Sequence, residues 1–175
     1  MAQLAKGFAS RVDDPEQSIE WFKRAAALAD TVDSTWTSAI CRGELSMMLA
    51  LHGDPHEALQ LGLAQVLAFR RAGDTARVRA FIRLQLRALH HLIEGPQRLD
   101  VVTLHAGTAD RPRVREPFID DAVEHVIAQI IEALGHAAVD AALSRGARMH
   151  DAEILELALN TIHTATNPPP APQAQ

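Results

Sequence analysis

The residues of this chain that could bind a metal ion are its histidines, of which there are nine. A zinc site needs three or four converging ligands, and two ligands on one helix are usually four residues apart. His52 and His56 have that spacing, but the Gly-Asp-Pro sequence between them interrupts any helix. His90 and His91 are adjacent, so on a helix their side chains point about 100° apart. The histidines therefore predict no metal site, and we expect them to be structural or solvated.

The single cysteine, Cys41, is the candidate for a reactive thiol. A thiol nucleophile needs a nearby base and electropositive surroundings to become a thiolate. Cys41 lies in an apolar stretch of helical periodicity, and its neighbour Arg42 would point away from it on a helix. We therefore predict that Cys41 is a small buried hydrophobic residue. The sequence predicts no catalytic centre, so we expect a non-enzymatic protein without a cofactor.

The most regular polar feature is a set of three arginines, Arg79, Arg83 and Arg87, which we call the arginine row. Residues four apart share one face of a helix. A helical array could use such a row to bind an acidic peptide, a phosphate or a partner domain. The interpretation that we favour is a solvated face, or ion pairs with the chain's own C-terminal helices, because single runs of charge are usually solvated. Those helices are acidic, since residues 120–156 contain eight acids and two arginines.

A second alternative use of the arginine row is contact with DNA by a DNA-associated regulator. No segment has the pattern of a recognition helix. The net charge of −5 and the pI of about 6.0 also argue against a nucleic-acid-binding domain. DNA binding through this chain alone is therefore not expected. The sequence has neither a signal-peptide pattern nor an apolar run long enough to span a membrane, so we expect a cytoplasmic protein with no membrane contact.

A repeat of helix-start signals positions these side chains. Asp14-Pro15-Glu16-Gln17 returns as Asp54-Pro55-His56-Glu57, 40 positions later, and a looser copy opens at Gly95-Pro96-Gln97. Aspartate before proline is typical of a helix start. The carboxylate accepts hydrogen bonds from free backbone amides, and the proline needs no hydrogen bond at the first helical position. Gly53 precedes one of these starts, as Gly73 precedes Asp74, and we expect a left-handed glycine to close the preceding helix at each.

Between these signals the apolar residues recur with a helical period. We predict an all-α fold, with one helical domain over residues 1–165 and a proline-rich disordered tail over 166–175. The connections are short, with the longest at 108–117, so successive helices should be antiparallel neighbours. The nine predicted helices cover residues 2–11, 15–32, 35–52, 55–72, 75–93, 97–107, 117–133, 136–145 and 151–163. The apolar stretch 118–134 should pack in the core, and a homodimer seam is its alternative role.

The second repeat resembles the tetratricopeptide (TPR) pattern. Leu45 and Leu49 occupy large apolar positions of a first helix, and Gly53-Asp54 is followed by Ala58 at the small packing position. Gly62 departs from the pattern, because an aromatic residue is usual there. The resemblance implies a TPR-like solenoid of about nine antiparallel helices.

The sequence from Ile131 to Leu159 resembles the end of the TPR-like region in large actinobacterial LuxR-type transcriptional regulators and related adenylate-cyclase-linked signalling ATPases. It contains a Leu-Gly pair, an alanine-rich helix, a small turn and a helix with an acidic start. Residues 14–107 are also similar to that region. The family often has a serine before the last helix, where this chain has His150, and Glu153 can still supply the acidic half of a capping box.

The resemblance implies a sensor or scaffold segment. Nothing in this sequence resembles a glycine-rich phosphate loop, so the resemblance implies that ATP or cyclase chemistry belongs to other domains. The function that we predict is a non-enzymatic module that binds a protein segment or an effector in a transcriptional or signalling context. Its predicted partner-binding residues are Arg79, Arg83 and Arg87.

Overall fold

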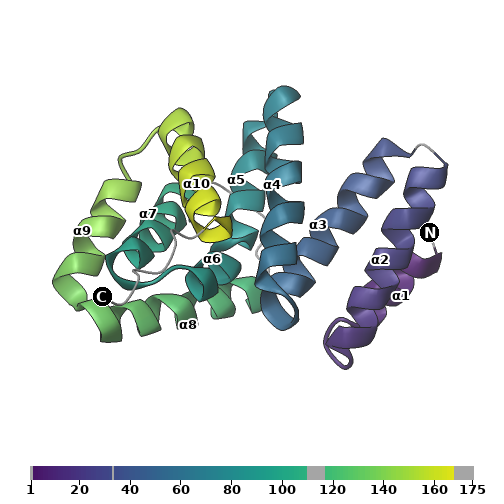
Figure 1. The fold of residues 1–175 in the computed structure, drawn as a ribbon, viewed down its shortest axis with the longest axis horizontal. Helices are drawn as coiled ribbons and strands as arrows, with labels where there is room; N and C mark the ends of the chain where they lie inside the picture. The colour runs from purple at the N-terminus through teal and green to yellow at the C-terminus, as the bar shows by residue number, and fades with distance from the viewer. Residues whose placement is uncertain (1, 33, 110–116, 168–175) are drawn as a thin grey trace, which may run out of the picture.

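The computed structural model describes residues 2–32, 34–109 and 117–167. Every regular element within these residues is a helix, so the predicted all-α class is confirmed (Figure 1). The described residues form ten α-helices and one short 3-10 helix. They are α1 (Ala2–Ser10), α2 (Pro15–Thr31), α3 (Thr35–His52), α4 (Pro55–Arg71), α5 (Thr75–Leu84), α6 (Leu86–Leu92), η1 (Gly95–Gln97), α7 (Arg98–Ala109), α8 (Pro117–Leu134), α9 (His136–Gly146) and α10 (Asp151–Thr166).

Two predicted irregular segments are shorter than expected. The loop predicted at 108–117 loses its first two residues to α7, which continues to Ala109, while α8 begins at Pro117, where the helix 117–133 is predicted to begin. The tail predicted at 166–175 loses its first residue to α10, which ends at Thr166. The remainder of that loop, 110–116, and tail residues 168–175 lie outside the described residues.

The aspartates of the repeat begin helices as predicted. The carboxylates of Asp14, Asp54 and Asp74 each accept a hydrogen bond from a backbone amide two or three residues further on, at 3.0, 2.8 and 3.0 Å. Pro15 and Pro55 occupy the first position of α2 and α4. Local chemistry therefore sets where these helices begin.

The prediction that Gly53 is left-handed is wrong. Gly53 has φ −127° and ψ −145°, whereas Gly73 and Gly95 have positive φ values of 71° and 56°. The Gly53 amide donates to the Leu49 carbonyl at 2.9 Å. A Cβ at Gly53 would lie 2.7 Å from Leu49 Cδ2, so a larger residue here would require the Leu49 side chain to move.

The predicted helix 75–93 is divided at Gln85 into α5 and α6. The Gln85 side chain is fully buried, and its Nε2 donates to the Ser46 hydroxyl at 2.7 Å. That hydroxyl donates to the Ala58 carbonyl at 3.0 Å. Gly62 makes room for this polar group, because a Cβ there would lie 2.3 Å from Gln85 Cδ. Gly62 thus faces the buried amide of Gln85.

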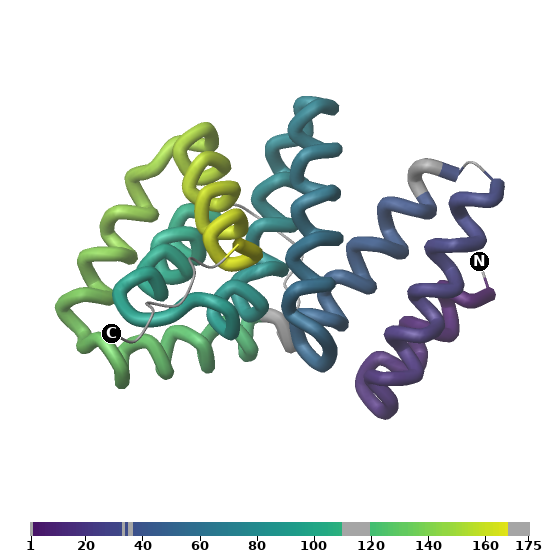
Figure 2. The backbone as a smooth tube through the Cα atoms, viewed as in Figure 1, coloured from purple at the N-terminus to yellow at the C-terminus, as the bar shows by residue number. Residues whose placement is uncertain are grey.

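The first five helices pack in the order of the sequence. Each of α1 to α4 lies against the next helix, and neighbouring helices run antiparallel (Figure 1). From α7 onward the expectation of sequential neighbours does not hold. Helix α7 packs mainly on α9, and α8, the green helix along the lower side of the C-terminal helices in Figure 2, contacts α6, α7 and α9. Helix α10 returns to contact α4, α5, α6 and α7, which brings its acidic start to α5.

The core is mainly aliphatic, and its largest fully buried side chain is Phe22. Val123, Val126 and Ile130 of α8 are buried in the same core, so much of the apolar face of α8 packs within the chain. Among the described residues, the exposed large apolar side chains lie on α1 and α2 and just after each of them; they are Phe8, Val12, Leu28 and Val32. Among the described helices, none has both the length and the apolar character needed to cross a membrane.

Candidate functional site

The arginine row follows α5 and continues onto α6. Arg79 and Arg83 lie on α5 and Arg87 lies on α6, beyond the interruption at Gln85. The row extends from the start of α10, which Arg79 contacts, to the end of α3, where the charge of Arg87 acts on His52. The structure therefore gives the three predicted residues three different surroundings.

Arg79 is paired with the first residue of α10. Arg79 Nη2 and Asp151 Oδ1 form an ion pair, in which the Arg79 side chain is 16% exposed and the Asp151 side chain 38%. Asp151 also lies in the first turn of its helix, where the helix dipole favours a carboxylate. The pair connects the start of α10 to α5 across a sequence separation of 72 residues.

Arg83 forms an ion pair that is more buried than that of Arg79. Its Nη2 donates to Asp120 Oδ1 of α8 at 2.8 Å, with side chains only 8% and 16% exposed. Arg83 Nη1 lies 3.0 Å from His105 Nδ1, which must be the acceptor because a guanidinium only donates. A buried ion pair of this kind is strongly destabilising to break from one side.

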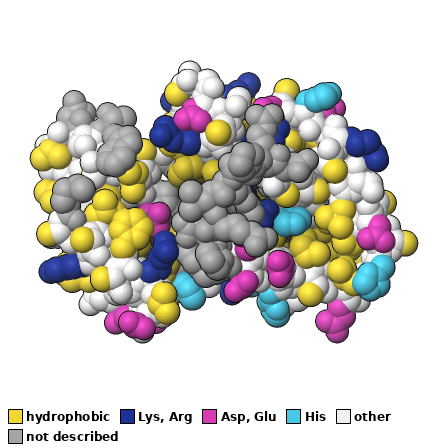
Figure 3. Space-filling model, turned by 180° about the vertical axis from the view of Figure 1, so that it is seen from behind, with side chains coloured by type: hydrophobic (Ala, Val, Ile, Leu, Met, Phe, Trp, Pro, Cys, Tyr) yellow, Lys and Arg dark blue, Asp and Glu magenta, His cyan; other side chains and the backbone are white. Residues whose placement is uncertain are grey.

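The acidic C-terminal helices thus supply carboxylates to two members of the arginine row. This arrangement agrees with the ion pairs that are favoured for the row from its sequence, and it offsets two of the charges on which DNA contact would depend. Figure 3 shows a face on which the visible Lys and Arg side chains are interspersed with acidic ones rather than gathered into one basic field. The geometry gives the DNA alternative no support.

Two hollows flank the pair of Arg79 and Asp151. The smaller has a volume of about 280 Å³ and lies among α4, α5 and the start of α10. Its walls are mostly apolar, and its charged members are on three different helices. It is lined by Arg70, Gly73, Thr75, Val78, Arg79, Ile82, Asp151, Ala152, Ile154 and Leu155. The larger hollow, of about 520 Å³, is more polar and lies between α7, the end of α9 and the start of α10.

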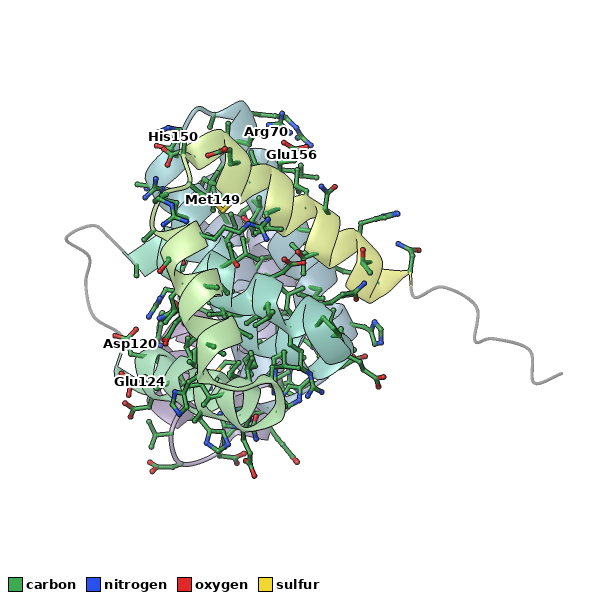
Figure 4. All side chains as sticks on the ribbon, turned by 90° about the vertical axis from the view of Figure 1, so that its left-hand side faces the viewer. Arg70, Asp120, Glu124, Met149, His150 and Glu156 are labelled. Carbon is green, nitrogen blue, oxygen red and sulfur yellow. The ribbon has the colours of Figure 1, made fainter. Side chains whose placement is uncertain are left out.

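The turn between α9 and α10 forms a wall of the larger hollow. Met149 and His150 line it from this turn, and Figure 4 shows them at the same end of the molecule as Arg70, with Asp120 at the opposite end. The His150 amide donates to Glu153 Oε2 at 2.7 Å, which confirms the predicted acidic half of a capping box. The turn is therefore fixed by its own sequence.

Close packing of α7 and α9 holds this turn against α5. A Cβ at Gly146 would lie 2.1 Å from the Thr103 carbonyl oxygen, so the two helices could not approach as closely with any other residue there. Asp100 of α7 lies 3.8 Å from Arg145 of α9. Burial raises the pKa of the Asp100 carboxyl, and the neighbouring arginine opposes that rise.

Arg87 lies among histidines rather than carboxylates. Burial lowers the pKa values of His52, His90 and His91, and the positive charge of Arg87 lowers each of them further. Arg98 adds to this effect at His90 and His91. Buried His90 also makes a hydrogen bond of 2.9 Å from its Nε2 to Gln129 Oε1 of α8. This end of the row therefore has an excess of positive or potentially positive groups.

Cys41 is fully buried, as predicted, and lines an apolar hollow between α1, α2 and α3. Burial raises the pKa of the Cys41 thiol, which disfavours the thiolate. In the described part of the chain, no three side chains among His, Cys, Asp and Glu are grouped so that they could hold a metal ion.

Sequence reasoning did not identify the partners of the row, Asp120 and Asp151, or the hollow beside Ile154. The acidic composition of the C-terminal segment was the one available signal. This composition did not indicate which acid pairs with which arginine, because the pairing depends on how α8 and α10 pack on α5. Local periodicity does not encode such long-range contacts.

Comparison with known proteins adds no relative to this description. No protein-family model matches the chain, and neither the curated proteins nor the solved structures give a significant match.

Proposed function

We propose that this chain is a non-enzymatic, TPR-like helical module that binds a segment of a partner protein. Two copies of the 40-residue repeat correspond to the helix pairs α2–α3 and α4–α5, whose helices pack on each other. The C-terminal sequence resembles a region of transcriptional and signalling regulators, which suggests that context. The partner segment binds where α10 meets the second pair.

The observation that carries the proposal is the hollow of about 280 Å³ among α4, α5 and α10. Ligand pockets are usually about 300–1,000 Å³, so this one suits one or two large side chains better than a cofactor. Val78, Ile82 and Ile154 supply apolar surface. Apolar anchors in such pockets carry much of the energy of protein interfaces.

The charges beside the hollow favour an acidic residue next to the apolar anchor. Arg70 is an exposed side chain of α4 and lines the hollow. A guanidinium can form two parallel hydrogen bonds with a carboxylate. The recognised segment therefore combines a large apolar residue with a neighbouring aspartate or glutamate.

Selection from a random peptide library, followed by titration calorimetry, tests this function. Ala152 lines both hollows, and Ala152→Trp would fill the space that the anchor needs. Ala141→Trp, on the exposed side of α9, is the matched control. Selected peptides should share an apolar residue beside an acid, and Ala152→Trp should weaken their binding by about tenfold or more.

The control variant should bind these peptides as the wild type does. Enrichment of no common peptide would contradict the proposal. Wild-type affinity in the Ala152→Trp variant would show that the hollow of about 280 Å³ is not the binding site.

A further inference from the structure

Arg87 differs from the other members of the arginine row in having no acidic partner among the residues that the structure describes. Its Nε is buried and makes no hydrogen bond, and the side chain as a whole is half-buried. Removing a cation from water without a counter-charge is unfavourable. A bound anion would offset that cost.

Two exposed histidines accompany Arg87. His91 is one turn further along α6, so it shares a face with Arg87. His52 is the last residue of α3, and α3 packs against α6. The shared face of α6 and the packing of α3 on this helix bring Arg87, His91 and His52 to one region of the surface, where the charge of Arg87 acts on both rings.

We propose that Arg87, His52 and His91 form a binding site for a doubly charged oxyanion, the chemistry of a phosphoryl group. An arginine offers five N–H donors in a fixed fork, and each protonated imidazole offers two more. One singly charged carboxylate would leave most of these donors unused. Arg87 and one protonated histidine match a charge of −2.

Anion binding at this site takes up protons. In the ligand-free chain, partial burial and then the charge of Arg87 lower the pKa values of His52 and His91, which disfavours the protonated rings. A bound dianion favours the protonated rings, so affinity rises as the pH falls from about 7.5 to about 6. The change is at most about tenfold per pH unit for each proton taken up.

Few groups outside this cluster act on its histidines. Arg98 of α7 acts on His91, and buried His90 of α6 is hydrogen-bonded to Gln129 of α8. Helices α4 and α10 also pack on α6, but among the described residues none of their titratable groups shifts the pKa of His52, His90 or His91. The site depends on this cluster and not on the hollow beside α10, so either proposal can fail without the other.

Nuclear magnetic resonance of the imidazole rings in the full chain tests the site. The probe is sulfate, which remains a dianion through the pH range in which histidine titrates. Acetate and chloride at matched ionic strength are the comparisons. We expect saturable shifts of the His52 and His91 rings with sulfate, upward movement of their pKa values, and weaker effects of acetate.

Variants separate binding from structure. Arg87→Met should weaken sulfate binding by about tenfold or more, because it removes charge-assisted hydrogen bonds. Arg71→Met, at the exposed end of α4, should bind as the wild type does. His91→Gln keeps a donor but cannot titrate, so it should bind sulfate with a weaker dependence on pH, which also tests the site if Arg87→Met does not fold.

The proposal is overturned by any of three results. These are no saturable sulfate shift in the wild type, acetate binding as tightly as sulfate, and a pH dependence in His91→Gln equal to that of the wild type.

Discussion

The two ends of the arginine row have the same side chain in opposite electrostatic surroundings. On α5, Arg79 and Arg83 are paired with carboxylates from α10 and α8. On α6, Arg87 lies beside histidines whose pKa values it lowers. The spacing that places the three residues on one face is therefore no guide to a common role.

In the arginine row, the packing of the helices and the binding of a ligand depend on the same guanidinium chemistry. An arginine with a buried carboxylate partner stabilises the packing of distant helices and has little capacity left for a ligand. An arginine without such a partner does not stabilise helix packing through an ion pair, and its charge is available to bind an anion.

Asp120→Ala should give the largest loss of stability. It leaves Arg83 as a buried cation, and removal of one partner from such a pair costs about 3 kcal/mol or more. Urea unfolding followed by circular dichroism measures the loss. Asp121→Ala changes an exposed neighbour on the same helix and should cost less than about 0.5 kcal/mol. Equal losses in the two variants would contradict the buried pairing.

Asp151→Ala should cost less, about 1 kcal/mol, because the Asp151 side chain is 38% exposed and water screens its pair with Arg79. The same experiment at high salt should reduce the loss further, since salt screens exposed charges more than buried ones. A loss that equals that of Asp120→Ala and does not respond to salt would mean that the two ion pairs are equivalent.

Acidification should lower the stability of the fold through the histidines beside Arg87. Burial and then Arg87 lower the pKa values of His52 and His91 in the folded chain, so the unfolded chain binds protons more readily. The free energy of unfolding should therefore fall as the pH drops below about 6.5, and the fall should end once the pH is below the pKa values of His52 and His91 in the folded chain. Arg87→Met should show a shallower fall in the same unfolding experiment, and an unchanged slope would contradict the influence of Arg87.

The starts of the helices could be predicted because their causes are local. Asp14, Asp54 and Asp74 each cap a helix within three residues of their own position. Burial of Cys41 followed from the periodicity around it. Such features depend on neighbours in the sequence, which a pattern of residue types contains.

The candidate site could be predicted only in part, because its partners come from distant segments. Arg83 and Asp120 are 37 residues apart, and Arg79 and Asp151 are 72 apart. The sequence pattern placed the arginines on one face but did not indicate that α10 returns to α5. Gly62 was likewise recognised as unusual, while its reason, the buried amide of Gln85, lies on another helix.

The most direct test of the difference between the two ends is one substitution made at each position of the row. Arg83→Met, Arg79→Met and Arg87→Met remove the same charge and keep a similar apolar stem, and urea unfolding near neutral pH compares them. We expect a loss of about 3 kcal/mol for Arg83→Met and about 1 kcal/mol for Arg79→Met. Arg87→Met should be neutral or slightly stabilising, by about 0.5 kcal/mol, because it removes an uncompensated charge. Three equal losses, or the largest loss at Arg87, would contradict the account.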